Sequence, residues 1–110
     1  MKFTLVVMRG PGNGRCQERA QRFAQAVVAQ GCQLERVFFY GDGTRAAAPD
    51  NAETAESWAA IATEQDTDLV LCSASAEYHG ALSPPAPFVL MGLGALMEAG
   101  FDSERIISFD

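Results

Sequence analysis

Short runs of consecutive apolar residues predict the strands of a covered β-sheet. Residues 3–8 form a β-prone run with no polar alternation beyond Thr4, which is typical of a strand covered on both faces. Three later runs have the same character: residues 34–40, 68–72 and 105–109. Glycine-rich turns follow the first two runs, so each of these strands is expected to end at its turn.

Between the predicted strands the apolar positions change to helical spacing. After the first glycine-rich turn they fall on one face of a helix that Gly31 is expected to stop. A second helix is predicted to begin near Asn51. A short third helix is predicted around Leu93, with Gly100 as its stop. Helices therefore alternate with strands along the chain.

Two segments fit neither period. The alanine-rich residues 44–51 are expected to form an exposed loop, and the proline-rich residues 83–87 a rigid, extended interruption. The order of strands and helices implies parallel pairing with right-handed crossovers. We therefore predict an α/β fold with a single domain over residues 1–110. It would contain an open, mostly parallel sheet of four or five strands with helices on both faces.

The charge of the chain argues against nucleic acid as a direct partner. Eight Lys and Arg residues stand against fourteen Asp and Glu residues, which gives a net charge of −6. The basic residues are scattered along the chain instead of forming a stripe. Because affinity for nucleic acid rests mainly on neutralising phosphates, we expect protein or small-molecule partners.

The sequence also favours an intracellular setting. Only six apolar or neutral residues separate Lys2 from Arg9, which is too short for a secretory core. The longest uncharged apolar run, residues 88–97, is about half of the roughly 20 residues that a membrane-spanning helix needs. The three cysteines show no C-x-x-C spacing. We expect a cytoplasmic protein with reduced thiols and no membrane contact, and we predict no cofactor and no metal site.

Cys72 is the strongest candidate for chemistry in this sequence. It ends a predicted strand, and the small residues Ser73, Ala74, Ser75 and Ala76 follow it. Chemistry in α/β proteins gathers at the carboxyl ends of strands, and a helix N-terminus beside a thiol favours the thiolate. We therefore expect an exposed, sulfur-handling cysteine that the backbone N–H groups of Ser73 and Ala74 support.

Other candidate features have ready structural explanations. Cys16 lies on the apolar face of the first predicted helix, and Cys32 lies beside the glycine that ends it. His79, the only histidine, would lie about 10 Å along a helix from Cys72, too far for direct contact, so an exposed position is expected. Residues 9–15 resemble an anion cradle but match neither G-x-G-x-x-G nor the Walker A pattern. A plain turn is favoured there over a phosphate or nucleotide site.

Several sequence segments resemble the DsrE/TusD group of small sulfurtransferase subunits. They are the opening M-K-F-T-L-V-V, the strand end V-F-F-Y-G-D-G, the segment L-C-S-A-S-A-E-Y-H-G around Cys72, and F-V-L-M-G-L-G-A-L-M-E-A near the C-terminus. These segments cover both ends and the middle of the chain in the right order. The last one, with its G-L-G-A-L core, is the most specific. The resemblance implies a DsrE-like fold.

The resemblance further implies that Cys72 carries sulfane sulfur as a persulfide. The chain would then act in a sulfur relay, with small sulfur-carrier proteins as donor and acceptor, in tRNA 2-thiouridine synthesis or sulfur oxidation. A homo- or hetero-oligomer with related subunits is implied. The alternative is a non-catalytic subunit of such a complex, with residues 88–97 packed between protomers. This chain departs from the family in carrying Glu77, Tyr78 and His79 where basic residues are common, and in having two shorter connections.

Overall fold

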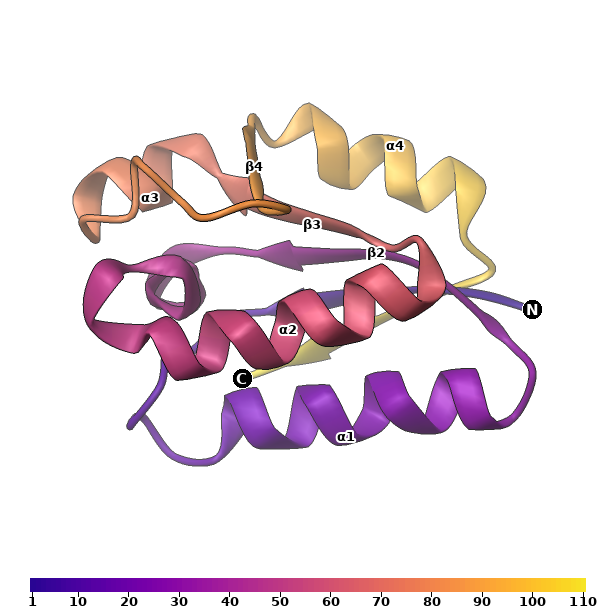
Figure 1. Ribbon diagram of the computed structural model, residues 1–110. Coiled ribbons are helices and arrows are strands. Elements are labelled where there is room, and N and C mark those ends of the chain that lie inside the picture. Colours follow the sequence, from indigo (N-terminus) through magenta and orange to yellow (C-terminus); the bar gives the residue numbers. More distant parts are fainter.

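A parallel sheet of five strands forms the centre of the computed structural model (Figure 1). The structure describes the backbone of residues 1–110 and the side chains of residues 1–100 and 102–110. The strands are β1 (Lys2–Val7), β2 (Gln33–Phe39), β3 (Asp68–Cys72), β4 (Val89–Met91) and β5 (Arg105–Phe109). Their order is β4-β3-β2-β1-β5, and every neighbouring pair is parallel. The predicted sheet is confirmed. The proline-rich residues 83–87 form no helix or strand, as predicted, and lead into β4.

Helices cover both faces of this sheet, as predicted. α1 (Cys16–Ala29) and α2 (Ala52–Gln65) lie together on one face, and α4 (Gly94–Asp102) lies on the other (Figure 1). The short α3 (Ser73–Tyr78) follows β3 at the carboxyl edge of the sheet. None of the helices in the described part of the chain is long and apolar enough to cross a membrane.

The ends of the helices agree only partly with the prediction. Gly31 follows α1 with a φ of 76°, as expected of a glycine that stops a helix. Gly100, however, does not stop α4, which continues to Asp102. A glycine inside a helix costs some stability but does not end it when the following residues still pack. At Gly100 a Cβ would meet only the side chain of Ile106, at an ordinary contact distance of 3.7 Å.

The alternation of side chains along the strands separates two hydrophobic clusters. Leu71 points into the large cluster beneath α1 and α2. Its neighbours Val70 and Cys72 belong to a smaller cluster that Ala95 of α4 covers. Successive side chains of a strand point to opposite faces, so adjacent residues enter different clusters. Cys72 therefore lies on the face of the sheet that carries α4.

The segment that follows β2 is not the exposed loop predicted for residues 44–51. It consists of two short 3₁₀-helices, η1 (Gly41–Ala47) and η2 (Pro49–Asn51). Thr44 and the alanines at positions 46–48 are buried at the carboxyl edge of the sheet. The prediction fails because small side chains without a period can pack against other elements as readily as they can face water.

Candidate functional site

Cys72 lies where the sequence predicted it, between a strand and a helix. It is the last residue of β3 and the N-cap residue of α3. Ser73 and Ala74 are the first two residues of that helix, so their N–H groups are among those that an α-helix leaves without an internal partner. The thiol is therefore at the carboxyl edge of the sheet, where parallel α/β folds hold their ligands.

The side chain of Cys72 is buried, which the sequence pattern did not predict. Only 3% of the residue is exposed, and it packs with Phe38, Val70 and Ala95. Leu96 of α4 packs against the same cluster. The expectation of an exposed cysteine is wrong for the isolated chain, because α4 returns across the sheet from a segment distant in sequence. The residues adjacent to Cys72 in the sequence do not indicate that α4 covers its side chain.

The other two cysteines do not end strands. Cys16 begins α1 and is 1% exposed, within the large cluster on the opposite face of the sheet. Cys32 is half-buried immediately before β2, at the amino edge of the sheet. All three thiols are free. The positions of Cys16 and Cys32 agree with the structural roles predicted for them.

The glycine-rich loop 9–15 binds a carboxylate of the chain itself. The N–H of Gly10 donates to Asp42 Oδ2 at 2.8 Å, and Asn13 Nδ2 donates to the same oxygen at 3.2 Å. Arg45 Nη1 donates to Asp42 Oδ1 at 3.3 Å. Burial opposes ionisation of Asp42, but these hydrogen bonds outweigh it and hold the pKa of the carboxyl below its ordinary value. Gly10 and Asn13 of the loop thus donate to a carboxylate of the same chain. This agrees with the sequence analysis, which favoured a plain turn over a phosphate or nucleotide site.

Asp42 is expected to contribute stability that disappears in acid. Because its folded-state pKa is below the ordinary 3.8, the ionised carboxylate stabilises the fold above that pH. The contribution is lost as the pH falls through the lower folded-state pKa. Asp42→Asn should therefore melt at a lower temperature than the wild type at neutral pH, and the difference in Tm should shrink in acid. Thermal unfolding from neutral pH to well below pH 3.8 measures this.

Glu56 is exposed, so Glu56→Gln is a matched control that removes one carboxylate from the surface. It should leave the acid dependence of the wild type unchanged. A difference between Asp42→Asn and the wild type that stays constant with pH would contradict the role of charge at Asp42.

His79 faces Asp42. Its Nδ1 atom lies 3.9 Å from Asp42 Oδ1, and its side chain is 23% exposed. The ring of Tyr78 meets the imidazole edge-on at a centroid distance of 4.9 Å. His79 is thus partly buried, contrary to the exposed position predicted for it. No hydrogen bond joins it to Cys72 among the described side chains, so the structure supplies no cysteine–histidine pair.

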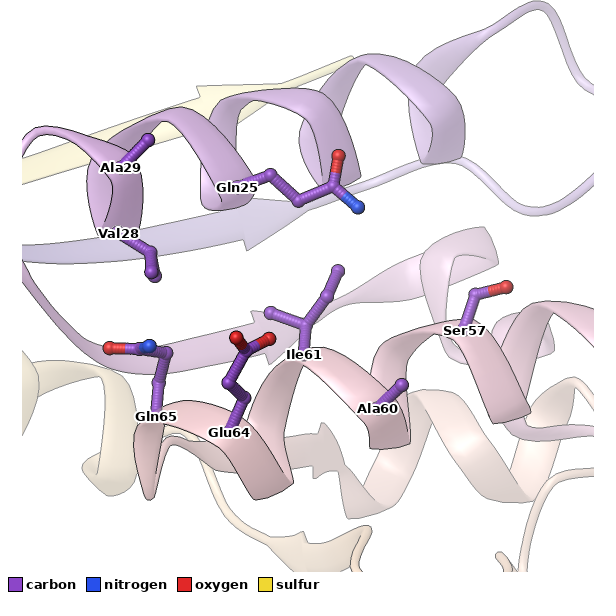
Figure 2. A pocket seen from close by; sticks show the side chains of 8 residues that line it. All are labelled: Gln25, Val28, Ala29, Ser57, Ala60, Ile61, Glu64 and Gln65. Carbon is purple, nitrogen blue, oxygen red and sulfur yellow. The ribbon is translucent and has the colours of Figure 1, made fainter.

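A groove of about 470 Å³ lies between α1 and α2 (Figure 2). Apolar side chains such as Val28 and Ile61 line its floor, and polar ones such as Gln25 and Glu64 stand at its rim. The complete lining is Gln25, Val28, Ala29, Ser57, Ala60, Ile61, Glu64 and Gln65. The sheet separates this groove from the α4 face, which holds Cys72. The groove therefore belongs to a different surface from the candidate thiol.

Comparisons with known proteins relate the whole chain to one family. The sequence pattern of the DsrE/DsrF-like family matches residues 1–109. The chain is 32% identical to DsrE of Allochromatium vinosum, with 99% of this chain and 98% of that protein covered. It is 34% identical to the sulfurtransferase TusD homolog of Vibrio parahaemolyticus, with the same coverage. In fold it is similar to the YchN protein of E. coli, with a TM-score of 0.84 over 99% of each chain at 19% identity.

The alignments with these relatives are longer than the chain. They extend over 128 positions, whereas the chain has 110 residues. The relatives therefore carry residues within the aligned region that this chain lacks.

Proposed function

Because the chain belongs to the DsrE/DsrF-like family, we propose that it is a sulfurtransferase that carries sulfane sulfur as a persulfide on Cys72. Relatives named sulfurtransferase TusD align over almost its full length, which supports the class of reaction. The observation that carries the choice of residue is position: of the three cysteines, only Cys72 ends a strand and immediately precedes a helix. In this proposal the N–H groups of Ser73 and Ala74 support the sulfur.

The proposed transfer consists of two displacements at sulfur. The Cys72 thiolate attacks the outer sulfur of a persulfide on the donor, the S–S bond of the donor breaks, and the donor leaves as a thiolate. Cys72 then holds the persulfide. The thiolate of an acceptor attacks the outer sulfur of this persulfide, takes it, and releases the Cys72 thiolate. Each step exchanges one S–S bond for another, so the reaction requires no external oxidant or reductant.

The proposed donor and acceptor are small sulfur-carrier proteins that each present a cysteine. The relay would serve tRNA 2-thiouridine synthesis or sulfur oxidation in the cytoplasm, where thiols stay reduced. Exposed apolar side chains lie on β4, on α4 and in the turn between them, next to the strand that Cys72 ends: Val89, Met91, Leu93 and Met97. Exposed apolar side chains that form a contiguous surface mark contact with other proteins. We therefore propose a homo- or hetero-oligomer with related subunits.

Sulfur loading tests the proposal directly. The intact protein, incubated with a small-molecule persulfide, should gain the mass of one sulfur atom. Reduction with dithiothreitol should remove this mass, and peptide mapping should place it on the peptide that contains Cys72. Absence of the gain, or an equal distribution of sulfur over the three cysteines, would overturn the proposal.

The burial of Cys72 favours a second candidate function, a non-catalytic subunit of an oligomeric complex of this family. In that role the apolar surface of β4 and α4 packs against a related subunit, and Cys72 is a small core residue. Sulfur loading of Cys72 in the assembled complex separates the two candidate functions. A Cys72 that accepts sulfur from neither small persulfides nor carrier proteins, in a chain that still assembles, would establish the second one.

A further inference from the structure

Arg36 attaches the helix that covers Cys72 to the sheet. Arg36 lies on β2, and its Nη1 atom donates a hydrogen bond of 2.6 Å to the backbone oxygen of Ala95. Ala95 is the second residue of α4 and packs in the same cluster as Cys72. Arg36 Nη2 also lies 3.3 Å from Asp68 Oδ2, on the strand that Cys72 ends. One guanidinium thus joins α4 to two neighbouring strands.

This attachment leaves part of the guanidinium unsatisfied. Arg36 Nε is buried and has no hydrogen-bond partner among the described residues. A buried N–H without a partner loses its hydration and gains nothing in return. The cost of this unpaired N–H offsets part of the stabilisation that the 2.6 Å bond to Ala95 provides.

The remaining contact between α4 and the sheet is small at its amino-terminal end. Among the described side chains of the helix, the fully buried ones are those of Ala95 and Ala99, which contribute little apolar area, and Leu96 adds a partly buried contact with the Cys72 cluster. Leu93, which precedes the helix, and Met97 within it are 52% and 70% exposed. At the other end, the hydroxyl of Ser103 is hydrogen-bonded to that of Thr4 on β1. The carboxyl-terminal end of α4 is thus anchored independently of Arg36.

We propose that Arg36 is a positioning residue that holds the amino-terminal half of α4 closed over Cys72, and that release of its bond to Ala95 opens the thiol to reactants. The helix then pivots about its anchored carboxyl-terminal end. The proposal deepens the proposed function, because it explains how a buried cysteine meets a sulfur donor. The closure itself controls the access of any thiol reagent, so it can be tested separately from sulfur transfer.

The alkylation rate of each cysteine measures this closure. The native protein is treated with iodoacetamide, and the modification of each cysteine-containing peptide is followed with time by mass spectrometry. Arg36→Met, which keeps much of the apolar stem, should alkylate at Cys72 about tenfold faster than the wild type, the effect of losing one charge-assisted hydrogen bond. Arg36→Lys can still donate to Ala95 and should return the rate most of the way to the wild-type value.

Two controls separate this opening from general loss of structure. Cys16 lies in the large cluster on the other face, so its alkylation should stay slow in every variant. Arg105→Met removes an exposed arginine on β5 and should leave the rate at Cys72 unchanged. An unchanged Cys72 rate in Arg36→Met, or a parallel rise at Cys16, would overturn the proposal. Faster alkylation of Cys72 without sulfur loading in any variant would instead overturn the proposed function and leave the closure intact.

Discussion

Replacement of Cys72 by alanine is expected to abolish sulfur loading, whereas Cys16→Ala and Cys32→Ala should load as the wild type does. The proposed persulfide forms on the Cys72 sulfur, and no neighbouring thiol at the carboxyl edge of that strand can substitute for it. Alanine is preferred to serine because Cys72 lies among apolar side chains, where a hydroxyl would be buried without a partner. The mass gain after incubation with a persulfide, and the rate of sulfur release to an acceptor thiol, measure the effect.

Cys16→Ala is the matched control for this experiment. Both cysteines are buried, so each change removes one sulfur from a packed cluster and costs a similar amount of stability. Equal thermal stability of the two variants, with loading lost only in Cys72→Ala, would support the assignment. If Cys72→Ala still gained one sulfur atom, the carrier would have to be another thiol, and Cys32, which is only half-buried, would be the first to examine.

Gly43→Ala is expected to destabilise the fold by about 3 kcal/mol or more. A Cβ at this position would lie 2.0 Å from the backbone oxygen of Val7 and 2.8 Å from its carbonyl carbon. These atoms belong to the end of β1, and the same oxygen accepts a hydrogen bond of 3.0 Å from Tyr40 N. The backbone cannot yield there without breaking the junction of β1 and η1. Chemical denaturation of wild type and variant measures the loss.

A displacement of η1 caused by Gly43→Ala should also displace α3, the helix that follows Cys72. Gly41 N donates to Ser75 Oγ at 3.0 Å, so a displaced η1 pulls on α3. Gly92→Ala is the matched control, because a Cβ at Gly92 would have no atom within 4 Å. Its free energy of unfolding should stay within about 0.5 kcal/mol of the wild type. A Gly43→Ala variant that is equally stable would show that η1 can move away from β1 at little cost.

Much of the fold follows from local patterns. The strands Asp68–Cys72 and Arg105–Phe109 have the bounds that their apolar runs predicted. The parallel order follows from the alternation of strands and helices, because a helix that runs back along the sheet returns the chain to the edge where the preceding strand began. Some local expectations fail. Within residues 44–51, expected to form an exposed loop, Thr44 and the alanines at positions 46–48 are buried, and α4 runs past Gly100. The strand Val89–Met91 was not assigned from the sequence.

For the candidate site, too, some features follow from the local sequence and others only from the tertiary structure. That Cys72 ends a strand and precedes a helix can be read from the residues on either side of it, because strand and helix periods are local properties. Its burial, the pairing of His79 with Asp42, and the bond from Arg36 to Ala95 could not be read there. Each of these contacts joins segments that are far apart in the chain, and no period or spacing encodes which ones meet. The cysteine proposed to carry sulfur can thus be found from one short segment of the sequence, whereas its burial depends on how distant segments pack in the folded chain.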